Sequence, residues 1–341
     1  LFTIRDGGSS YLTLSQSSGF LSLQRSLTLP YTTNSTSGVI YKQNDRFLHN
    51  YGFYNTYLGL FSGNFTQNGA ENTGIGTYSL FTITSGSFNT GVGTYSLFSN
   101  TTGSNNTAVG EKSLYSNTSG YHNTAIGVSS LYFNISGINN TAFGSNSLFG
   151  NNGDYNTALG SGSLAFNSTG FRNTAVGMGS LNSNLTAVEN TAVGCTSLCT
   201  NTTGFSNTAL GYSSLYFNLT GSHNTALGYQ SLLFNTTGAE NTALGYNSLF
   251  SNTINSGNTA VGWNSLYSST GWQNTAVGHH SLNLNTSGNY NTAIGYNAGS
   301  LVTTGHNLTL IGIDANPSSG TANDQITLGN GFVSSLRCNV T

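Results

Sequence analysis

A seventeen-residue repeat is the feature that most restricts how this chain folds. The dipeptide Asn-Thr recurs every 17 residues, apart from two intervals of 16, with the consensus N-T-A-(V/I/L)-G-x-x-S-L-x-x-N-x-(S/T)-G-x-x. Helical solenoids need repeats of roughly 33 residues or more and an apolar period near 3.6. Short strands joined by Asn- and Gly-rich turns instead predict an all-β fold, a parallel β-solenoid (β-roll) of about sixteen coils. The units begin at Asn55, Asn72, Asn89, Asn106, Asn123, Asn140, Asn156, Asn173, Asn190, Asn207, Asn224, Asn241, Asn258, Asn274 and Asn291.

Each column of the repeat, numbered from its asparagine as position one, has a physical role. Position four is apolar in all fifteen units and position nine is Leu in thirteen, which predicts two buried aliphatic side chains per coil. Ala at position three and Gly at position five lie on the other face of the strand, which predicts a surface that another backbone approaches closely. Gly at position fifteen follows Asn-x-Ser/Thr, and a left-handed turn conformation is expected there. In one unit the predicted ladder residues are Asn106, Val109, Gly110, Ser113 and Leu114.

The repeat divides the chain into three predicted parts: a β-rich leader (1–54), the solenoid (55–312) and a C-terminal cap (313–341). At about 4.8 Å per coil, sixteen coils give a rod roughly 75–80 Å long. Two aliphatic side chains per coil bury too little surface to offset the ordering of the whole coil at about 1.5 kcal/mol per residue. We therefore expect several chains to associate, with the small-residue face as their interface.

The charge content excludes several classes of protein. Seven basic residues against nine acidic ones cannot line a groove for nucleic acid. No window approaches 18 apolar residues, so no membrane insertion is expected. The chain starts at Leu1 and its first twenty residues lack a signal-peptide pattern, so we expect a processed piece. The low charge suits the repeat, because like charges stacked about 4.8 Å apart repel one another whereas Asn, Ser and Thr form ladders.

The repeats resemble those of known fibrous proteins. The run from Asn55 to Gly312 resembles the head repeats of trimeric autotransporter adhesins, whose N-S-x-A-I-G-x-x-S units form a left-handed parallel β-roll. It is still more similar to the N-T-A-V-G-x-x-S-L arrays of viral and phage tail-fibre proteins. Residues 33–40 and 46–52 are similar to the segment before those arrays, and residues 325–341 to the segment before their self-cleaving C-terminal chaperone domain. The resemblance implies a homotrimeric rod that stops where such a chaperone would begin.

Aromatic residues gather at position ten. The candidate stacking residues for a receptor glycan are Phe98, Tyr115, Tyr132, Tyr216, Phe250 and Tyr267, and further rings stand beside them at position eleven. A purely structural ladder of rings is the alternative. An exposed row of rings would suit sugars on a host surface, because exposed apolar patches mark binding sites.

The sequence contains fifteen N-x-S/T sequons, nine of them at position twelve. They offer possible N-glycosylation sites and hence a glycosylated filament. The alternative is a turn that needs Asn, Ser/Thr and Gly for its own geometry. The nine are Asn100, Asn117, Asn134, Asn167, Asn184, Asn201, Asn218, Asn235 and Asn285.

No arrangement of residues predicts catalysis, a metal or a cofactor. Glu71, Glu189 and Glu240 share position seventeen, but the nearest two lie three coils apart, about 14 Å, too far for a glycosidase pair. The three cysteines, Cys195, Cys199 and Cys338, form no CxxC pair and are expected to be thiols. The histidines are expected on the surface.

Taken together, these patterns predict a structural and adhesive protein that is not an enzyme. We expect an extracellular fibre segment on a virus, phage or cell surface whose partners are copies of itself and a host glycan or protein receptor. The alternative is a cellular adhesin, or a glycosylated extracellular filament, of the same architecture.

Overall fold

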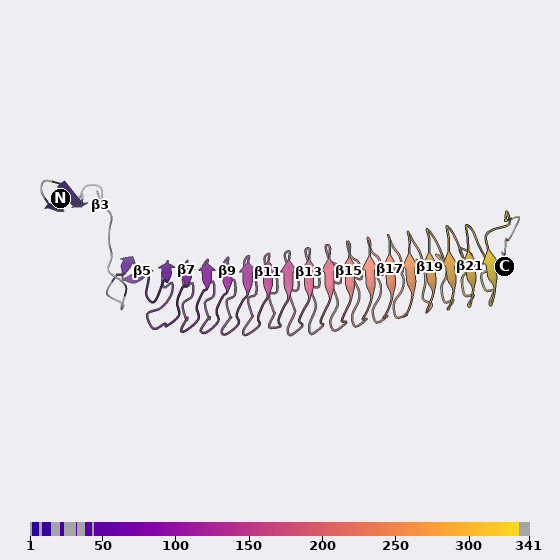
Figure 1. Cartoon of the computed structure of the whole chain (residues 1–341), viewed down its shortest axis with the longest axis horizontal. Coiled ribbons are helices and arrows are strands. Elements are labelled where there is room, and N and C mark those ends of the chain that lie inside the picture. The colour runs from indigo at the N-terminus through magenta and orange to yellow at the C-terminus, as the bar shows by residue number, and fades with distance from the viewer. Residues whose placement is uncertain are drawn as a thin grey trace, which may run out of the picture.

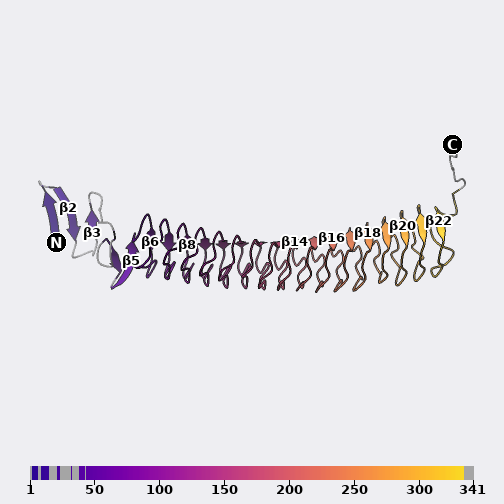
Figure 2. The same ribbon diagram turned by 60° about the horizontal axis from the view of Figure 1, so that its bottom comes forward.

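The structure, a computed structural model, describes residues 2–6, 9–14, 21–23, 32, 38–42 and 44–333. Regular structure in these residues is entirely β. The predicted parallel β-solenoid is confirmed, because strands β6 to β22 stack one after another along a rod (Figure 1). Figure 2 shows the loops of successive coils following the same path.

The strands of the stack are three residues long and occupy positions two to four of each coil. They are β6 (Thr56–Leu58), β7 (Thr73–Ile75), β8 (Thr90–Val92), β9 (Thr107–Val109), β10 (Thr124–Ile126), β11 (Thr141–Phe143), β12 (Thr157–Leu159), β13 (Thr174–Val176), β14 (Thr191–Val193), β15 (Thr208–Leu210), β16 (Thr225–Leu227), β17 (Thr242–Leu244), β18 (Thr259–Val261), β19 (Thr275–Val277), β20 (Thr292–Ile294), β21 (Thr309–Ile311) and β22 (Ile326–Leu328).

The N-terminal strands pair differently. Strands β1 (Phe2–Asp6), β2 (Ser9–Leu14) and β3 (Leu21–Leu23) form a small antiparallel sheet. Strands β4 (Ile40–Lys42) and β5 (Asp45–His49) form a hairpin, and β5 pairs antiparallel with β6. The hairpin therefore covers the first edge of the parallel stack. At the other end, the stack continues past the predicted boundary at residue 312, because β22 pairs in parallel with β21.

The register is exact even across the two shorter units. Thr141 pairs with Thr157, and Thr259 with Thr275, although one residue is missing from each intervening coil. The missing residue comes from the turn: Asn151 Nδ2 donates to the carbonyl two residues on, Gly153, whereas Asn134 reaches three residues on, to Gly137. The turn thus absorbs the deletion and the strands do not shift.

The core lies inside each coil, but its composition corrects one prediction. Leu114 is fully buried as expected, whereas Val109 at position four is only half-buried and the fully buried strand residue is Ala108. Alternation along the strand was predicted correctly, but the inward face was assigned the wrong way round. The coil is too narrow to hold a large side chain on both walls, so Ala faces Leu inside and the branched residue points outward.

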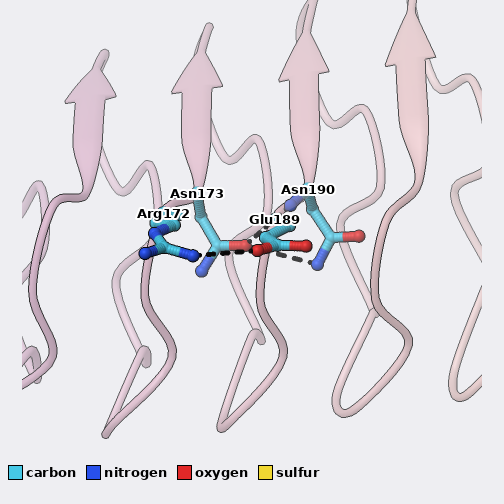
Figure 3. Close-up of polar contacts among 4 residues, drawn as sticks. All are labelled: Arg172, Asn173, Glu189 and Asn190. Atoms are coloured by element: carbon cyan, nitrogen blue, oxygen red, sulfur yellow. Dashed lines mark hydrogen bonds and ion pairs between the residues drawn. The ribbon is translucent and has the colours of Figure 1, made fainter.

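Buried amides join the coils to one another. Asn173 at position one donates from Nδ2 to the oxygen of Ala187 (2.8 Å) and to Oδ1 of Asn156 in the preceding coil (3.2 Å). Its own Oδ1 accepts from the backbone N–H (3.1 Å) and Nδ2 (3.3 Å) of Asn190 (Figure 3). Position twelve forms a second amide ladder, and Ser113 at position eight is fully buried too. The polar core is therefore stabilised by hydrogen bonds between coils.

Glycine is required where backbones meet. Gly110 at position five has φ +130°, and a Cβ there would lie 2.6 Å from the carbonyl oxygen of Gly127 in the next coil. The predicted left-handed conformation at position fifteen is wrong, because positive φ occurs at the glycines of position five and at the residues of positions seven, nine and seventeen, for example Lys112 and Leu114. Gly103 at position fifteen is needed instead for space, since a Cβ would lie 2.4 Å from the Asn100 amide oxygen.

Candidate functional site

The outer face of the long sheet carries two columns of side chains. Thr at position two and an aliphatic residue at position four point away from the coil, while the Ala between them is buried. The position-four column runs from β6 to β22, is aliphatic apart from Phe143, and includes strongly exposed members such as Phe143 (57% exposed) and Leu210 (42%). Ala at position three is buried inside the coil, so it does not form the interface between chains that the sequence predicted. The surface that offers uncovered apolar groups along the rod is the position-four column.

The predicted aromatic residues at position ten stack on one another. Phe98, Tyr115 and Tyr132 belong to one run, with ring centroids 5.2 Å and 5.0 Å apart and planes within 10° of parallel. The run extends to Phe81 before it and Phe149 after it. Because neighbouring rings cover each other's faces, a sugar could lie flat only on a ring at the end of a run. The rings within the run present their edges to solvent.

The remaining predicted rings lie farther along the rod. Phe250 and Tyr267 form a stacked pair with centroids 5.0 Å apart, and Tyr216 contacts Phe217 edge-on. The six predicted aromatic residues are therefore divided among separate groups, each half-buried.

A second aromatic column, at position six, was not recognised in the sequence. Adjacent rings of this column lie 5.2–5.5 Å apart over six consecutive coils, and most are about half exposed. The signal was present in the sequence as aromatic residues recurring at the repeat interval. The column consists of Tyr212, Tyr229, Tyr246, Trp263, His279 and Tyr296.

A shallow apolar groove of about 560 Å³ lies on another face. The stacked rings of Phe217 and Phe234, 5.3 Å apart, form one side and Leu219 lies opposite. The rest of the lining is uncharged and carries hydroxyl groups: Thr200, Thr236, Ser251 and Thr253. Position-eleven rings, rather than the position-ten rings singled out above, therefore form this hollow.

The sequon asparagines of position twelve are all inside the coil. Each of the nine has no solvent exposure. Asn117 is representative: its Nδ2 donates to Oδ1 of Asn100 (2.7 Å) and to the carbonyl of Gly120 (3.0 Å). The interpretation of this column as glycosylation sites on the folded rod is therefore wrong, because no amide of the column faces solvent.

The titratable side chains are scattered. Glu189 forms an exposed ion pair with Arg172 of the preceding coil at 3.2 Å (Figure 3). Over the described ranges, no three His, Cys, Asp or Glu residues lie close enough together to hold a metal ion. Cys195 and Cys199 are free thiols, and burial raises the pKa of Cys199. Cys338 lies outside the described residues.

His49 differs from the predicted surface histidines. It is the last residue of β5 in the N-terminal hairpin, and its buried ring contacts the rings of Tyr57 and Phe65. Its Nδ1 accepts from the Tyr51 N–H (3.3 Å), so Nε2 carries the proton donated to the Ser62 carbonyl (2.8 Å). The pKa of His49 is lowered to about 4, mainly by burial; the hydrogen bond to Ser62 opposes the shift and the nearby Arg46 guanidinium adds to it. His49 is therefore a neutral structural residue at physiological pH.

Comparisons with known proteins give no family. No protein-family model matches this chain, and no curated protein matches it significantly. Among the residues placed by the structure, none belongs to a helix long and apolar enough to cross a membrane. Function must therefore be argued from the surface of the rod itself.

Proposed function

We propose that this chain is a structural and adhesive segment of an extracellular viral or phage tail fibre. Its role is to space and present a host-receptor-binding surface, without catalysis. The observation that supports this proposal is the uninterrupted stack from β6 to β22, whose coils repeat one pattern and carry outward columns of uncharged side chains at positions two and four. A quasi-one-dimensional stack in which each coil contacts its neighbours suits a spacer, and variable outward positions suit recognition.

We further propose that the fibre is a homotrimer associated through the position-four column. Exposed apolar strips larger than a few hundred Å² are unusual on monomers and mark association surfaces. The strip follows the whole stack and contains no charged residue, so copies of the chain could align along its full length. The resemblance to trimeric fibres supports three chains rather than two.

The oligomeric state is tested by native mass measurement of the full chain. We expect a trimer for the wild type. A variant with Ile126→Lys, Val193→Lys and Val261→Lys should be monomeric, because three ammonium groups cannot be buried unpaired. The matched control places Ile135→Lys, Leu185→Lys and Leu219→Lys on exposed aliphatic residues of position thirteen and should remain trimeric. A monomeric wild type would contradict the trimer.

Receptor binding is tested with a glycan array and the intact fibre. If the rings near position ten contact sugar, replacing Phe217 and Phe234 in the groove by Ala should lower binding at least tenfold. Replacing Tyr229 and Tyr246 of the position-six column by Ala is the comparison, since both columns are exposed. Unchanged binding by both variants would contradict sugar recognition by the groove rings and by the position-six column. Binding to a protein receptor alone would favour the cellular-adhesin alternative or a protein-recognising fibre.

A further inference from the structure

The position-twelve sequons combine a modification motif with complete burial. All nine asparagines, at residues 100, 117, 134, 167, 184, 201, 218, 235 and 285, have no solvent exposure. The Ser or Thr that completes each sequon lies at position fourteen and is exposed in every case. The motif is thus accessible in the extended chain, whereas its acceptor nitrogen, Asn Nδ2, is buried inside the coil when the chain folds.

The acceptor amide has no spare hydrogen in the folded coil. Asn134 Nδ2 donates to Oδ1 of Asn117 at 2.9 Å and to the Gly137 carbonyl at 3.0 Å. Asn218 makes the equivalent pair with Asn201 (2.8 Å) and Gly221 (2.9 Å). A glycan on Nδ2 would replace one of these hydrogens and place a sugar ring where the interior is filled by Leu and Ala side chains. Glycosylation at position twelve and folding of that coil therefore exclude one another.

One sequon outside position twelve does not have this conflict. Asn105, at position seventeen and followed by Asn106 and Thr107, is exposed. Its side chain makes no hydrogen bond in the part of the chain that the structure describes. Asn105 can therefore carry a glycan on the folded rod. Its modification is an internal reference that reports whether the chain was exposed to a glycosylating enzyme.

We infer that this chain folds without passing, unfolded, through a compartment that contains an Asn-glycosylating transferase. In the transfer reaction the Asn Nδ2 attacks C1 of a sugar on a polyprenyl diphosphate donor. The N–C bond forms as the C1–O bond to the diphosphate breaks, polyprenyl diphosphate leaves, and the amide loses one proton. The enzyme acts on extended chain, so it would modify the position-twelve asparagines before the coil could bury them.

This inference concerns how the protein is made, and it does not depend on the proposed fibre function. Synthesis and folding in a cytosol, followed by release with a particle, satisfies it. Export through a compartment without the transferase satisfies it too. A filament secreted through a glycosylating pathway does not, which argues against the glycosylated-filament alternative.

The test is to make the full chain in cultured animal cells, either cytosolic or with a cleavable secretion signal. A secreted variant without the position-twelve sequons carries alanine at the nine position-fourteen residues: Thr102, Ser119, Ser136, Thr169, Thr186, Thr203, Thr220, Thr237 and Ser287. A tenth change, Thr66→Ala, removes the sequon of Asn64, whose amide donates to the Phe81 carbonyl (3.1 Å). The nine position-fourteen hydroxyl groups make no hydrogen bond in the described structure, so these nine substitutions leave the buried amides intact. Thr66→Ala removes one hydrogen bond, which Thr66 Oγ1 donates to Asn64 Oδ1 (3.1 Å).

Folding is read by protease resistance and circular dichroism, and glycan positions by mass spectrometry. The cytosolic chain and the secreted variant should fold, the variant with a glycan at Asn105. The secreted wild type should carry glycans at position twelve and be protease-sensitive, and an inhibitor of donor synthesis should restore its folding. A folded secreted wild type with sugar at position twelve would overturn the inference, as would one modified at Asn105 but not at position twelve. If the inhibitor did not restore folding, the inference would be overturned as well, because sugar would then not be the cause of misfolding in the secreted wild type.

Discussion

At the scale of single residues, the position-twelve ladder shows what each amide contributes, because one coil between Asn100 and Asn285 lacks it. Ser269 takes the place of Asn in the coil that begins at Asn258. As a result Asn252 Oδ1 has no hydrogen-bond partner, and Asn285 Nδ2 reaches Ser269 Oγ only at 3.3 Å. A buried acceptor without a partner costs about 1–3 kcal/mol. The ladder therefore has a defect at this coil.

Repairing the defect should stabilise the rod. We expect Ser269→Asn to raise the free energy of unfolding by about 1 kcal/mol, since the new amide can donate to Asn252 and accept from Asn285. The other shortened coil shows that the amide fits, because Asn151 occupies the same position there. Guanidinium unfolding measures the effect. Ser268→Asn, which adds the same amide on the outside, should give no gain, and equal stabilisation by both would contradict the ladder explanation.

At the scale of one strand and its neighbours, the position-one ladder depends on amides that donate and accept at once. Asn173 uses both hydrogens of Nδ2, donated to Asn156 and Ala187. Its Oδ1 accepts two hydrogen bonds from Asn190 (Figure 3). Aspartate has the same shape but no donor when ionised. Asn173→Asp would therefore remove one of the two donors to the Ala187 oxygen, which keeps only Asn184 Nδ2 (3.1 Å), and would place a charge in the core.

We expect Asn173→Asp to lower the free energy of unfolding by at least about 2 kcal/mol at pH 7. Burial raises the pKa of a carboxyl group, so the folded state binds the proton more tightly than the unfolded state and the loss should shrink as the pH falls toward 4. Unfolding curves at several pH values measure this. Glu189→Gln removes one charge from the exposed ion pair beside it and should change stability by less than about 1 kcal/mol. A pH-independent loss would contradict the buried-charge explanation.

The N-terminal hairpin should open in acid. His49 is neutral when folded and has a pKa of about 4, below its ordinary value of 6.5. The unfolded segment therefore binds more protons between these values, and stability present above pH 6.5 is lost as the pH falls toward 4, by up to about 3 kcal/mol. Because the coils are coupled only to their neighbours, the loss should be local to β5 and β6.

Hydrogen exchange at pH 7 and pH 4.5 measures this opening. Amides of β5 and β6 should lose protection in acid, while those of the central coils keep it. His49→Gln should remove the difference between the two pH values, and His122→Gln, on an exposed residue, should leave it in place. Equal loss along the whole rod would show that another group is responsible.

At the scale of the whole molecule, stability should be nearly a sum over coils. Deletion of residues 207–223 removes exactly one coil and joins two equivalent positions. We expect this variant to fold, with a rod about 4.8 Å shorter by small-angle scattering. Deletion of residues 207–214 places strand positions against turn positions and should abolish folding of the adjoining coils by circular dichroism. Equal tolerance of both deletions would contradict the strict register.

The repeat made the architecture predictable, and the limits of that prediction have physical causes. The period and the column of Leu114 indicated stacked coils, whereas alternation alone could not decide whether Ala108 or Val109 faces inward, because the width of the interior decides it. Gly103 has the composition of a left-handed turn but is required for backbone clearance. The sequon motif gives no information on burial, so Asn117 and Asn105 are alike in sequence and opposite in exposure.

The amide ladder also has a direction. In each described step of the position-one ladder, the oxygen of the earlier asparagine accepts from the later one, as Asn156 does from Asn173 and Asn173 from Asn190. A coil that has just formed therefore presents a ready acceptor to the next segment of chain. During synthesis from the N-terminus, that segment is the one leaving the ribosome. The coils can therefore fold one after another from the N-terminal end, at the rate at which the chain is translated.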